Sequence, residues 1–250
     1  MLCAGVTAHL PSLAALIGFV VVHLFATRLR FLDRTPRSIW LSIAGGVSVA
    51  YVFGHVLPEL SAGQQAISKA FERAPLYLEH HVYLVALRGL ALFYGVERLA
   101  ISSRRRQRND KGEDETSPAV FWIHIASFAI YNLSIGYLLL HREDMTARGL
   151  AIYFAAMSLH YLVTDHGLRA HHGRAYVAVG RFVLVIAIVA GWIIGMVTRV
   201  SEAFVAVLFA FLAGGVVLNV LKEELPEERQ SRFWAFLAGA GGYTALLLAV

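Results

Sequence analysis

Charged residues and cysteine are both scarce in this sequence. Asp, Glu, Lys and Arg make up 16% of its 250 residues, whereas soluble domains contain about 25%. Hydrophobic residues supply 58% of the chain, and the mean hydropathy is +0.61. This composition excludes an ordinary soluble globular domain and predicts a membrane protein. Because Cys3 is the only cysteine, an intrachain disulfide and a cysteine-based metal site are also excluded.

The chain is basic, with a formal net charge of +5 and a pI near 9.5. In a soluble protein, such an excess would suggest a nucleic-acid partner. In a polytopic membrane protein, Lys and Arg instead mark the cytoplasmic loops. We therefore expect the lipid bilayer, and no nucleic acid, as the partner of this chain.

Long apolar segments account for most of the sequence. A membrane-spanning helix needs about 20 mostly apolar residues. We predict eight such helices, at 10–27, 39–60, 78–100, 119–140, 147–168, 176–198, 202–222 and 231–250. The polar run 102–118 has no apolar periodicity and is predicted to be a flexible loop. The expected fold is an all-α polytopic membrane protein that forms a single transmembrane domain over residues 1–250.

Lys and Arg are unevenly divided between the predicted loops. The connections after the first, third, fifth and seventh helices hold most of them, including Arg104, Arg105 and Arg106. The positive-inside rule therefore places loop 102–118 in the cytoplasm and both termini outside. The predicted location is the cell membrane, plasma or inner.

Two apolar segments far apart in the sequence share one pattern. Residues 44–59 read AGGVSVAYVFGHVLPE, and residues 213–227 read AGGVVLNVLKEELPE. Aligning their Leu-Pro-Glu endings places Gly46 on Gly214. With eight spans these segments cross the membrane in opposite directions, which predicts a 3+2+3 inverted repeat. Inverted repeats recur in transporters, whose substrate site lies near the membrane midplane at the repeat interface.

Polar side chains inside spans are costly, and by default they face the bundle interior or an aqueous path. Oxygen and imidazole ligands suit Zn, Mn or Fe(II). One candidate set lies near mid-span, and another lies at the ends of the two repeat copies, where His55 and Glu223 are equivalent. The candidate metal ligands are Asn132, His160, Asp165, His55, Glu59 and Glu223.

The layout and four short motifs resemble the ZIP family of divalent metal transporters. In that family the second helix commonly ends His-Leu-Leu-Pro-Glu, similar to HVLPE at 55–59, and the seventh ends in a Leu-Pro-Glu element, similar to 225–227. Its fourth helix carries His-Asn-x-x-(Asp/Glu)-Gly, matched here by YNLSIG at 131–136. Its fifth carries His-Glu-x-Pro-His-Glu-x-Gly, matched by HYLVTDHG at 160–167. The resemblance implies eight helices, outside termini and a metal site between the fourth and fifth helices.

The chain departs from the family at several expected ligand positions. Tyr131 and Ile135 replace a histidine and an acid in the fourth helix, and Tyr161 and Thr164 replace an acid and a histidine in the fifth. A binuclear site is therefore dismantled. What the resemblance leaves is one ion held through Asn132, His160 and Asp165.

Structural explanations stand beside these functional ones. His160 could instead hydrogen-bond a neighbouring helix, and Asp165 could form an i, i+4 ion pair with Arg169. The histidines at 166, 171 and 172 form either a metal-capture cluster or a solvated interfacial patch, and the patch is the favoured interpretation.

The predicted function is a ZIP-like permease that moves a divalent cation, with Zn favoured over Mn and Fe, by alternating access. An alternative is a non-transporting ZIP-fold protein that serves as a sensor or partner subunit. A third is an intramembrane metal-dependent lipid hydrolase, which is weak because no His pair at i, i+4 and no Gly-x-Ser-x-Gly turn is present. We expect no enzyme activity, no resident cofactor, and a homodimer as the candidate assembly.

Overall fold

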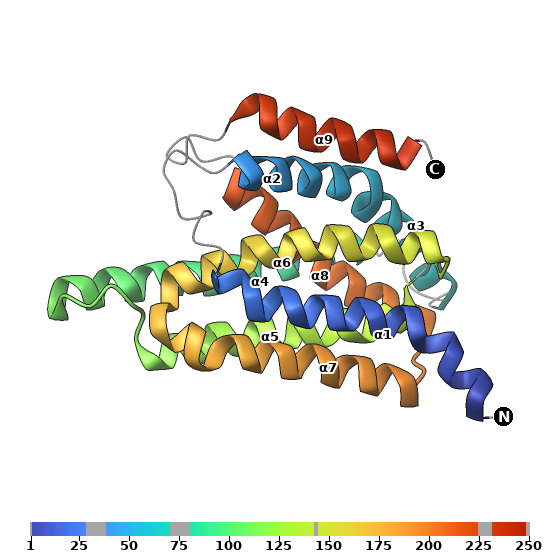
Figure 1. Cartoon of the computed structure of the whole chain (residues 1–250), viewed down its shortest axis with the longest axis horizontal. Coiled ribbons are helices and arrows are strands. Elements are labelled where there is room, and N and C mark those ends of the chain that lie inside the picture. Colours follow the sequence, from blue (N-terminus) through green and yellow to red (C-terminus); the bar gives the residue numbers. More distant parts are fainter. Residues whose placement is uncertain (1, 29–38, 71–80, 143–144, 225–231, 249–250) are drawn as a thin grey trace. The chain divides into compact units, whose positions relative to one another are not determined.

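The computed structural model describes residues 2–28, 39–70, 81–142, 145–224 and 232–248 (Figure 1). These residues are almost entirely helical and contain no strand, which confirms the predicted all-α class. They divide into two compact units. Unit 1 contains Met1–Arg28 and Leu99–Arg199, and unit 2 contains Leu29–Arg98 and Val200–Val250. Each unit therefore combines segments from both ends of the chain.

Several helices are apolar enough to cross a membrane. Within the described ranges, four stretches qualify by length and composition: Ser42–Gln65, Pro118–His141, Ala147–Val197 and Glu202–Lys222. Leu10–Phe25 and Phe233–Leu248 are shorter apolar helices. The stretch Ala147–Val197 has 51 residues and contains two of the predicted spans. Membrane-helix character is thus supported, and the count of eight spans stays a prediction.

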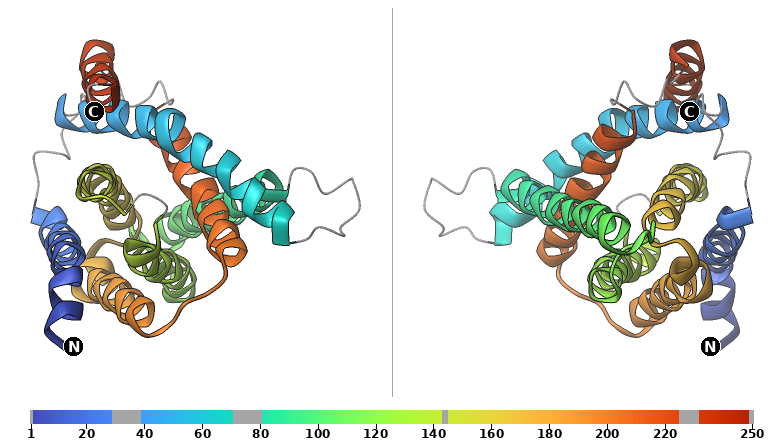
Figure 2. Two further views of the ribbon diagram at one scale, coloured as in Figure 1. Left: turned by 90° about the vertical axis from the view of Figure 1, so that its right-hand side faces the viewer. Right: turned by 90° about the vertical axis from the view of Figure 1, so that its left-hand side faces the viewer.

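Unit 1 is built mainly from α1 (Leu2–Phe25), α5 (Pro118–His141), α6 (Ala147–Ala175) and α7 (Arg181–Val197). These helices run side by side, with α5 packed along α7 and with α1 packed on α6 and α7 (Figure 2). Glycines bring α5 and α7 together, because a Cβ at Gly136 would overlap the Ile188 carbonyl and one at Gly191 would overlap the Leu133 carbonyl. Small residues allow this close backbone approach between helices in membranes.

Unit 2 is built from α2 (Ile39–Tyr51), α3 (Leu57–Ala70), the first part of α4 (His81–Lys111), α8 (Glu202–Glu224) and α9 (Phe233–Leu248). We predicted that the second helix ends near the Pro-Glu pair at 58–59. It instead continues to Ala70 through a π-helical turn, η3 (Val52–Val56). The wider turn precedes Pro58, which lacks the N–H of a regular helix, so the helix passes this proline without ending.

Glycine contacts in unit 2 are reciprocal between α2 and α9. A Cβ at Gly46 would overlap the carbonyl oxygen of Phe236 in α9, and a Cβ at Gly239 would overlap the carbonyl oxygen of Ile43 in α2. Each helix therefore supplies one glycine and, three residues earlier, one backbone carbonyl.

Helices α8 and α4 repeat this arrangement. A Cβ at Gly214 would overlap the carbonyl oxygen of Ala86, and a Cβ at Gly89 would overlap the carbonyl oxygen of Phe211. The three-residue spacing is the same as in the α2 and α9 pair. The contacts of Gly136 and Gly191 between α5 and α7 in unit 1 have this spacing as well, so it is a general feature of close helix contacts in this chain, and the alignment of Gly46 with Gly214 stays a prediction.

The two helix pairs differ at one equivalent contact. Lys222 Nζ of α8 lies 3.1 Å from Glu97 Oε2 of α4. In the other pair Gly54 lies against the Leu247 side chain. Each of these four residues comes eight positions after the packing glycine of its own helical segment. The α2/α9 and α4/α8 pairs therefore share a backbone arrangement, and one pair holds an ion pair where the other holds an apolar contact.

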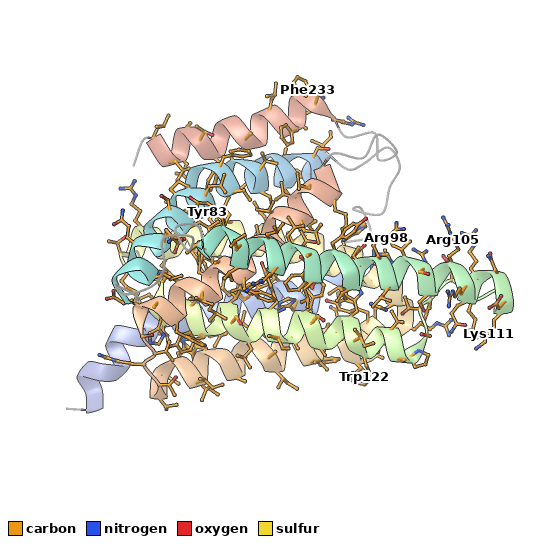
Figure 3. The ribbon with its side chains drawn as sticks, turned by 180° about the vertical axis from the view of Figure 1, so that it is seen from behind. Tyr83, Arg98, Arg105, Lys111, Trp122 and Phe233 are labelled. Atoms are coloured by element: carbon orange, nitrogen blue, oxygen red, sulfur yellow. The ribbon has the colours of Figure 1, made fainter. Side chains whose placement is uncertain are left out.

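The prediction of a flexible loop over 102–118 is wrong for its first part, because α4 continues to Lys111. Arg105 and Lys111 lie on these last turns (Figure 3). The helix ends at Gly112, whose φ of 71° places it in the left-handed region that favours glycine. The chain then folds back: Arg104 Nη2 donates to Asp114 Oδ2 at 2.6 Å, and the Ser117 backbone N–H donates to Ser103 Oγ at 2.9 Å.

Candidate functional site

A buried histidine of α1 joins two of the predicted ligands in unit 1. Its imidazole Nδ1 lies 3.0 Å from both carboxylate oxygens of Asp165 in α6. Its Nε2 lies 2.9 Å from Oδ1 of Asn132 in α5. This residue is His23, which is 0% exposed, and Asn132 and Asp165 are each 1% exposed. One ring thus connects three helices at a site closed to solvent.

The direction of these hydrogen bonds follows from the partners of Asn132 and Asp165. Asn132 Nδ2 donates to the Phe128 carbonyl at 2.8 Å, so its amide oxygen faces His23 as an acceptor. Tyr176 O–H donates to Asp165 Oδ1 at 2.6 Å. An ionised carboxylate only accepts. The arrangement is satisfied when His23 donates from both ring nitrogens, as an imidazolium beside the Asp165 carboxylate.

The position of Tyr176 depends on a local break in the helix. Gly173, with φ of 49°, interrupts α6, and the π-helical turn η5 (Tyr176–Gly180) follows and leads into α7. Tyr176 begins this turn and is 0% exposed. π-Turns occur often at functional sites. His23, Asn132, Asp165 and Tyr176 are called the His23 cluster below.

His160 belongs to a second buried group on the same pair of helices. Its Nε2 lies 3.2 Å from the Tyr131 hydroxyl and 3.4 Å from the Thr164 hydroxyl. The exposed fraction of His160 is 4%. Tyr131 and Thr164 stand where the ZIP motifs have histidines. The hydroxyl groups of Tyr131 and Thr164 therefore contact His160 at positions where the family motifs have metal ligands.

The three candidate ligands in unit 1 are thus divided between neighbouring groups. Asn132 and Asp165 belong to the His23 cluster, whereas His160 bonds to Tyr131 and Thr164. The Asp165 carboxylate contacts His23 and Tyr176, and the ion pair with Arg169 stays a prediction. Sequence patterns missed His23 and Tyr176. The signal for His23 was an ionisable residue inside an apolar run, which no motif singled out.

The His23 ring fills the space between the two candidate ligands Asn132 and Asp165. Among the residues that the structure describes, no three His, Cys, Asp or Glu side chains lie together as a ligand group. A metal bound to oxygen ligands lies about 2.0–2.2 Å from each. The imidazole of His23 separates the Asn132 and Asp165 oxygens, so one ion cannot reach both while the ring remains between them.

The remaining candidates lie in unit 2. His55 is in the π-turn η3, and its Nε2 lies 3.5 Å from Glu59 Oε2, one helical turn later. Both side chains are partly accessible, and the His55 ring stacks on Tyr51 with centroids 5.2 Å apart. Glu223 falls in the last turn of α8, but its side chain lies outside the described residues, as does the whole 225–227 motif.

The interpretation of the histidines near the end of α6 as a solvated patch is wrong for His172. This residue is 1% exposed, and its Nε2 lies 2.9 Å from Nδ1 of the buried His124 in α5. Its Nδ1 lies 2.6 Å from the Thr116 hydroxyl. The pair fastens α6 to α5 and to the segment before α5. The spacing of adjacent histidines could not show that one of them points inward.

No family model and no curated protein matches this chain. The resemblance to ZIP transporters therefore rests on the four motifs and on the order of the helices.

Proposed function

We propose that this protein is a ZIP-like membrane permease that moves a divalent cation, Zn, Mn or Fe(II), by alternating access. The observation that supports this most is the burial of the His23 cluster inside an apolar helical unit. Ionisable groups buried inside an apolar helical bundle are costly and mark ion or proton paths by default. Asn132 and Asp165, which the motifs selected, are both members of that cluster.

In this proposal His23 occupies the position that the transported cation takes. The imidazolium places positive charge against the Asp165 carboxylate and donates to Asn132, so it satisfies the same oxygens that a cation would need. The ion binds after the His23 side chain turns away. Because every member of the cluster belongs to unit 1, we expect unit 1 to carry the ion as one body.

Uptake into proteoliposomes tests the function. We expect Zn(II), Mn(II) or Fe(II) to enter vesicles with the wild-type protein above protein-free controls. We expect Asp165→Asn and Asn132→Ala to lower the rate at least about tenfold, since each removes an oxygen from the proposed ion site and even outer-shell changes at metal sites cost about 10–100-fold. Ser127→Ala is the matched control, because this half-buried side chain of α5 donates to the Ile123 carbonyl of its own helix and is not a member of either buried group.

The results separate the permease from a protein that keeps the fold without transport. If the wild-type protein is folded and none of the three metals enters, the permease proposal is abandoned. If uptake occurs and His160→Ala leaves it unchanged, the assignment of His160 to the ion site is wrong.

A second candidate, the non-transporting membrane protein, is favoured by one specific observation. Every candidate ligand in unit 1 already has protein partners, and the site closes without an ion. In this case His23 is a permanent replacement for the metal. The non-transporting candidate predicts no metal uptake by the wild-type protein and none by the His23→Ala variant.

A further inference from the structure

A second feature of unit 1 lies where α6 turns into α7, beside Tyr176 of the His23 cluster along the chain. A hollow of about 780 Å³ is lined by three arginines, one acid and apolar side chains. The lining includes Glu115, Arg169, Arg174, Val177, Arg181 and Phe182. Arginine is the side chain best suited to bind phosphate, because its planar guanidinium donates two parallel hydrogen bonds.

The carboxylate of Glu115, the acid in this hollow, accepts a hydrogen bond from the backbone. Glu115 Oε1 accepts from the Arg174 backbone N–H at 3.0 Å. The left-handed conformation of Gly173 allows this approach, since a Cβ there would overlap the Glu115 carboxylate. The backbone N–H of Thr116 also donates to the His171 carbonyl at 3.1 Å. These hydrogen bonds connect the segment at Glu115 and Thr116 to the end of α6 on one side of the hollow. The lining of the hollow carries three positive charges and one negative charge.

The hollow lies at the level where apolar helical stretches end. The apolar part of α7 begins directly after Arg181, and that of α6 ends directly before Arg169. Arg181 Nη1 donates to the Leu24 carbonyl at 3.2 Å, so the last turns of α1 lie at the same level. Arg side chains at the ends of apolar stretches typically lie at the depth of the lipid head groups.

We propose that the hollow binds the phosphate of an anionic phospholipid. The guanidinium groups of Arg169 and Arg174 would receive the phosphate, while Val177 and the exposed Phe182 face the start of an acyl chain. The net positive charge selects an anionic lipid over a zwitterionic one, as basic pockets between spanning helices do. This binding goes beyond the proposed transport and does not depend on it.

Native mass spectrometry of the delipidated full chain measures the binding. Phosphatidylglycerol and phosphatidylcholine with identical acyl chains are titrated separately. We expect the wild-type protein to bind phosphatidylglycerol at least tenfold more tightly, because each arginine near the surface adds about fivefold. We expect Arg169→Gln with Arg174→Gln to weaken phosphatidylglycerol binding about 25-fold. Arg181 is left intact, since it also holds α1.

The matched control removes two charges elsewhere. Arg105→Gln with Arg106→Gln changes the same net charge on exposed positions of α4, and we expect less than a twofold effect. Equal binding of both lipids by the wild-type protein, or an equal loss in both double variants, overturns the proposal. So does full competition by millimolar inorganic phosphate, which would assign the hollow to a free anion. If the pocket double variant does not fold, Arg174→Gln alone must weaken binding about fivefold.

Discussion

At the scale of single residues, the most informative contact is the pairing of His23 with Asp165. Both side chains are fully removed from solvent. Transferring either charge alone into such a place costs several kcal/mol, and only a close partner with further hydrogen bonds offsets that cost. Asn132 and Tyr176 supply those bonds. The pair is therefore stable as a unit and fragile when one member is removed.

Replacing His23 by alanine should destabilise the protein by about 3–5 kcal/mol, since it leaves the Asp165 carboxylate buried without its cation. Tyr176→Phe should cost less, about 1.5–3 kcal/mol, because it removes one hydrogen bond to a charged group. Unfolding in detergent micelles, followed by far-UV circular dichroism, measures both changes.

The permease proposal adds a stricter expectation for the same variant. With the imidazole gone, a divalent cation can take its place, so Zn(II) should raise the melting temperature of His23→Ala more than that of the wild type. His23→Ala combined with Asp165→Ala serves as the control and should lose the response to Zn(II). If the melting temperature of His23→Ala does not change with Zn(II), Mn(II) or Fe(II), the site does not bind these metals.

The sequence predicts half of this site for an understandable reason. Asn132 and Asp165 belong to motifs with fixed local spacing. His23 and Tyr176 reach Asp165 only through the packing of α1 on α6 and through the break at Gly173. The register of two packed helices is not encoded in the spacing of either one. A motif therefore identifies ligands on one helix and misses the partner that another helix supplies.

At the scale of elements, the extended end of α4 shows the limit of hydrophobic periodicity. Residues 102–111 are polar on every side, so no apolar face distinguishes a helix from a loop. Their Arg and Gln residues are nevertheless good helix formers. The bond from Arg104 to Asp114 then fastens the returning segment to the helix.

This fastening gives a pH-dependent prediction. The hydrogen bond from Arg104 is the main cause that lowers the pKa of Asp114 below its usual value of 3.8. A carboxyl whose folded-state pKa is depressed contributes stability above the unfolded pKa and loses it as the pH falls through the folded pKa. Arg104→Gln should therefore raise the pKa of Asp114 toward 3.8, as measured by carbon NMR of the labelled carboxyl. Arg106→Gln removes the same charge and is the matched control; it should leave the pKa of Asp114 unchanged, because Arg104 and Arg108 are the arginines that lower it.

The reciprocal glycines allow a test of the repeat at the level of helix pairs. Gly46→Ala and Gly214→Ala each place a methyl group against a backbone carbonyl of the partner helix. Each should therefore destabilise the protein by about 1–3 kcal/mol, the usual effect of overpacking. Gly241→Ala is the control in α9, where an added Cβ meets nothing within 4 Å. If only one of the two repeat glycines is sensitive, the two pairs are not equivalent in energy.

At the scale of the whole molecule, the two spatial units do not correspond to the repeats predicted from the sequence. The sequence predicts one repeat from the three helices before the polar segment and another from the last three helices, with two helices between them. The structure groups Met1–Arg28 with Leu99–Arg199, and Leu29–Arg98 with Val200–Val250. Periodicity gives the position of a helix along the chain but not its neighbour in space. The helical class and most helix positions are accordingly predictable, whereas the assignment of helices to units is not.

The membrane orientation is the remaining prediction at this scale, and single cysteines can test it. Cys3→Ser gives a cysteine-free chain. A cysteine is then introduced at Glu113, in the segment predicted to be cytoplasmic, or at Met145, in a connection predicted to be outside; both positions are exposed. A membrane-impermeant maleimide should label Met145→Cys in intact cells and Glu113→Cys only after permeabilisation. The reverse pattern would invert the orientation.

This orientation also decides which leaflet meets the arginine-lined hollow. Glu113 is separated by a single residue from Glu115, which lines the hollow, so protection at Glu113 places the hollow at the cytoplasmic face. Anionic lipids give that leaflet its negative surface potential. Labelling of Glu113→Cys in intact cells would instead turn the hollow toward the outer leaflet. Anionic lipid would then occupy the hollow less often in the cell than in the purified protein, because fewer anionic lipids would be present at the level of Arg169 and Arg174.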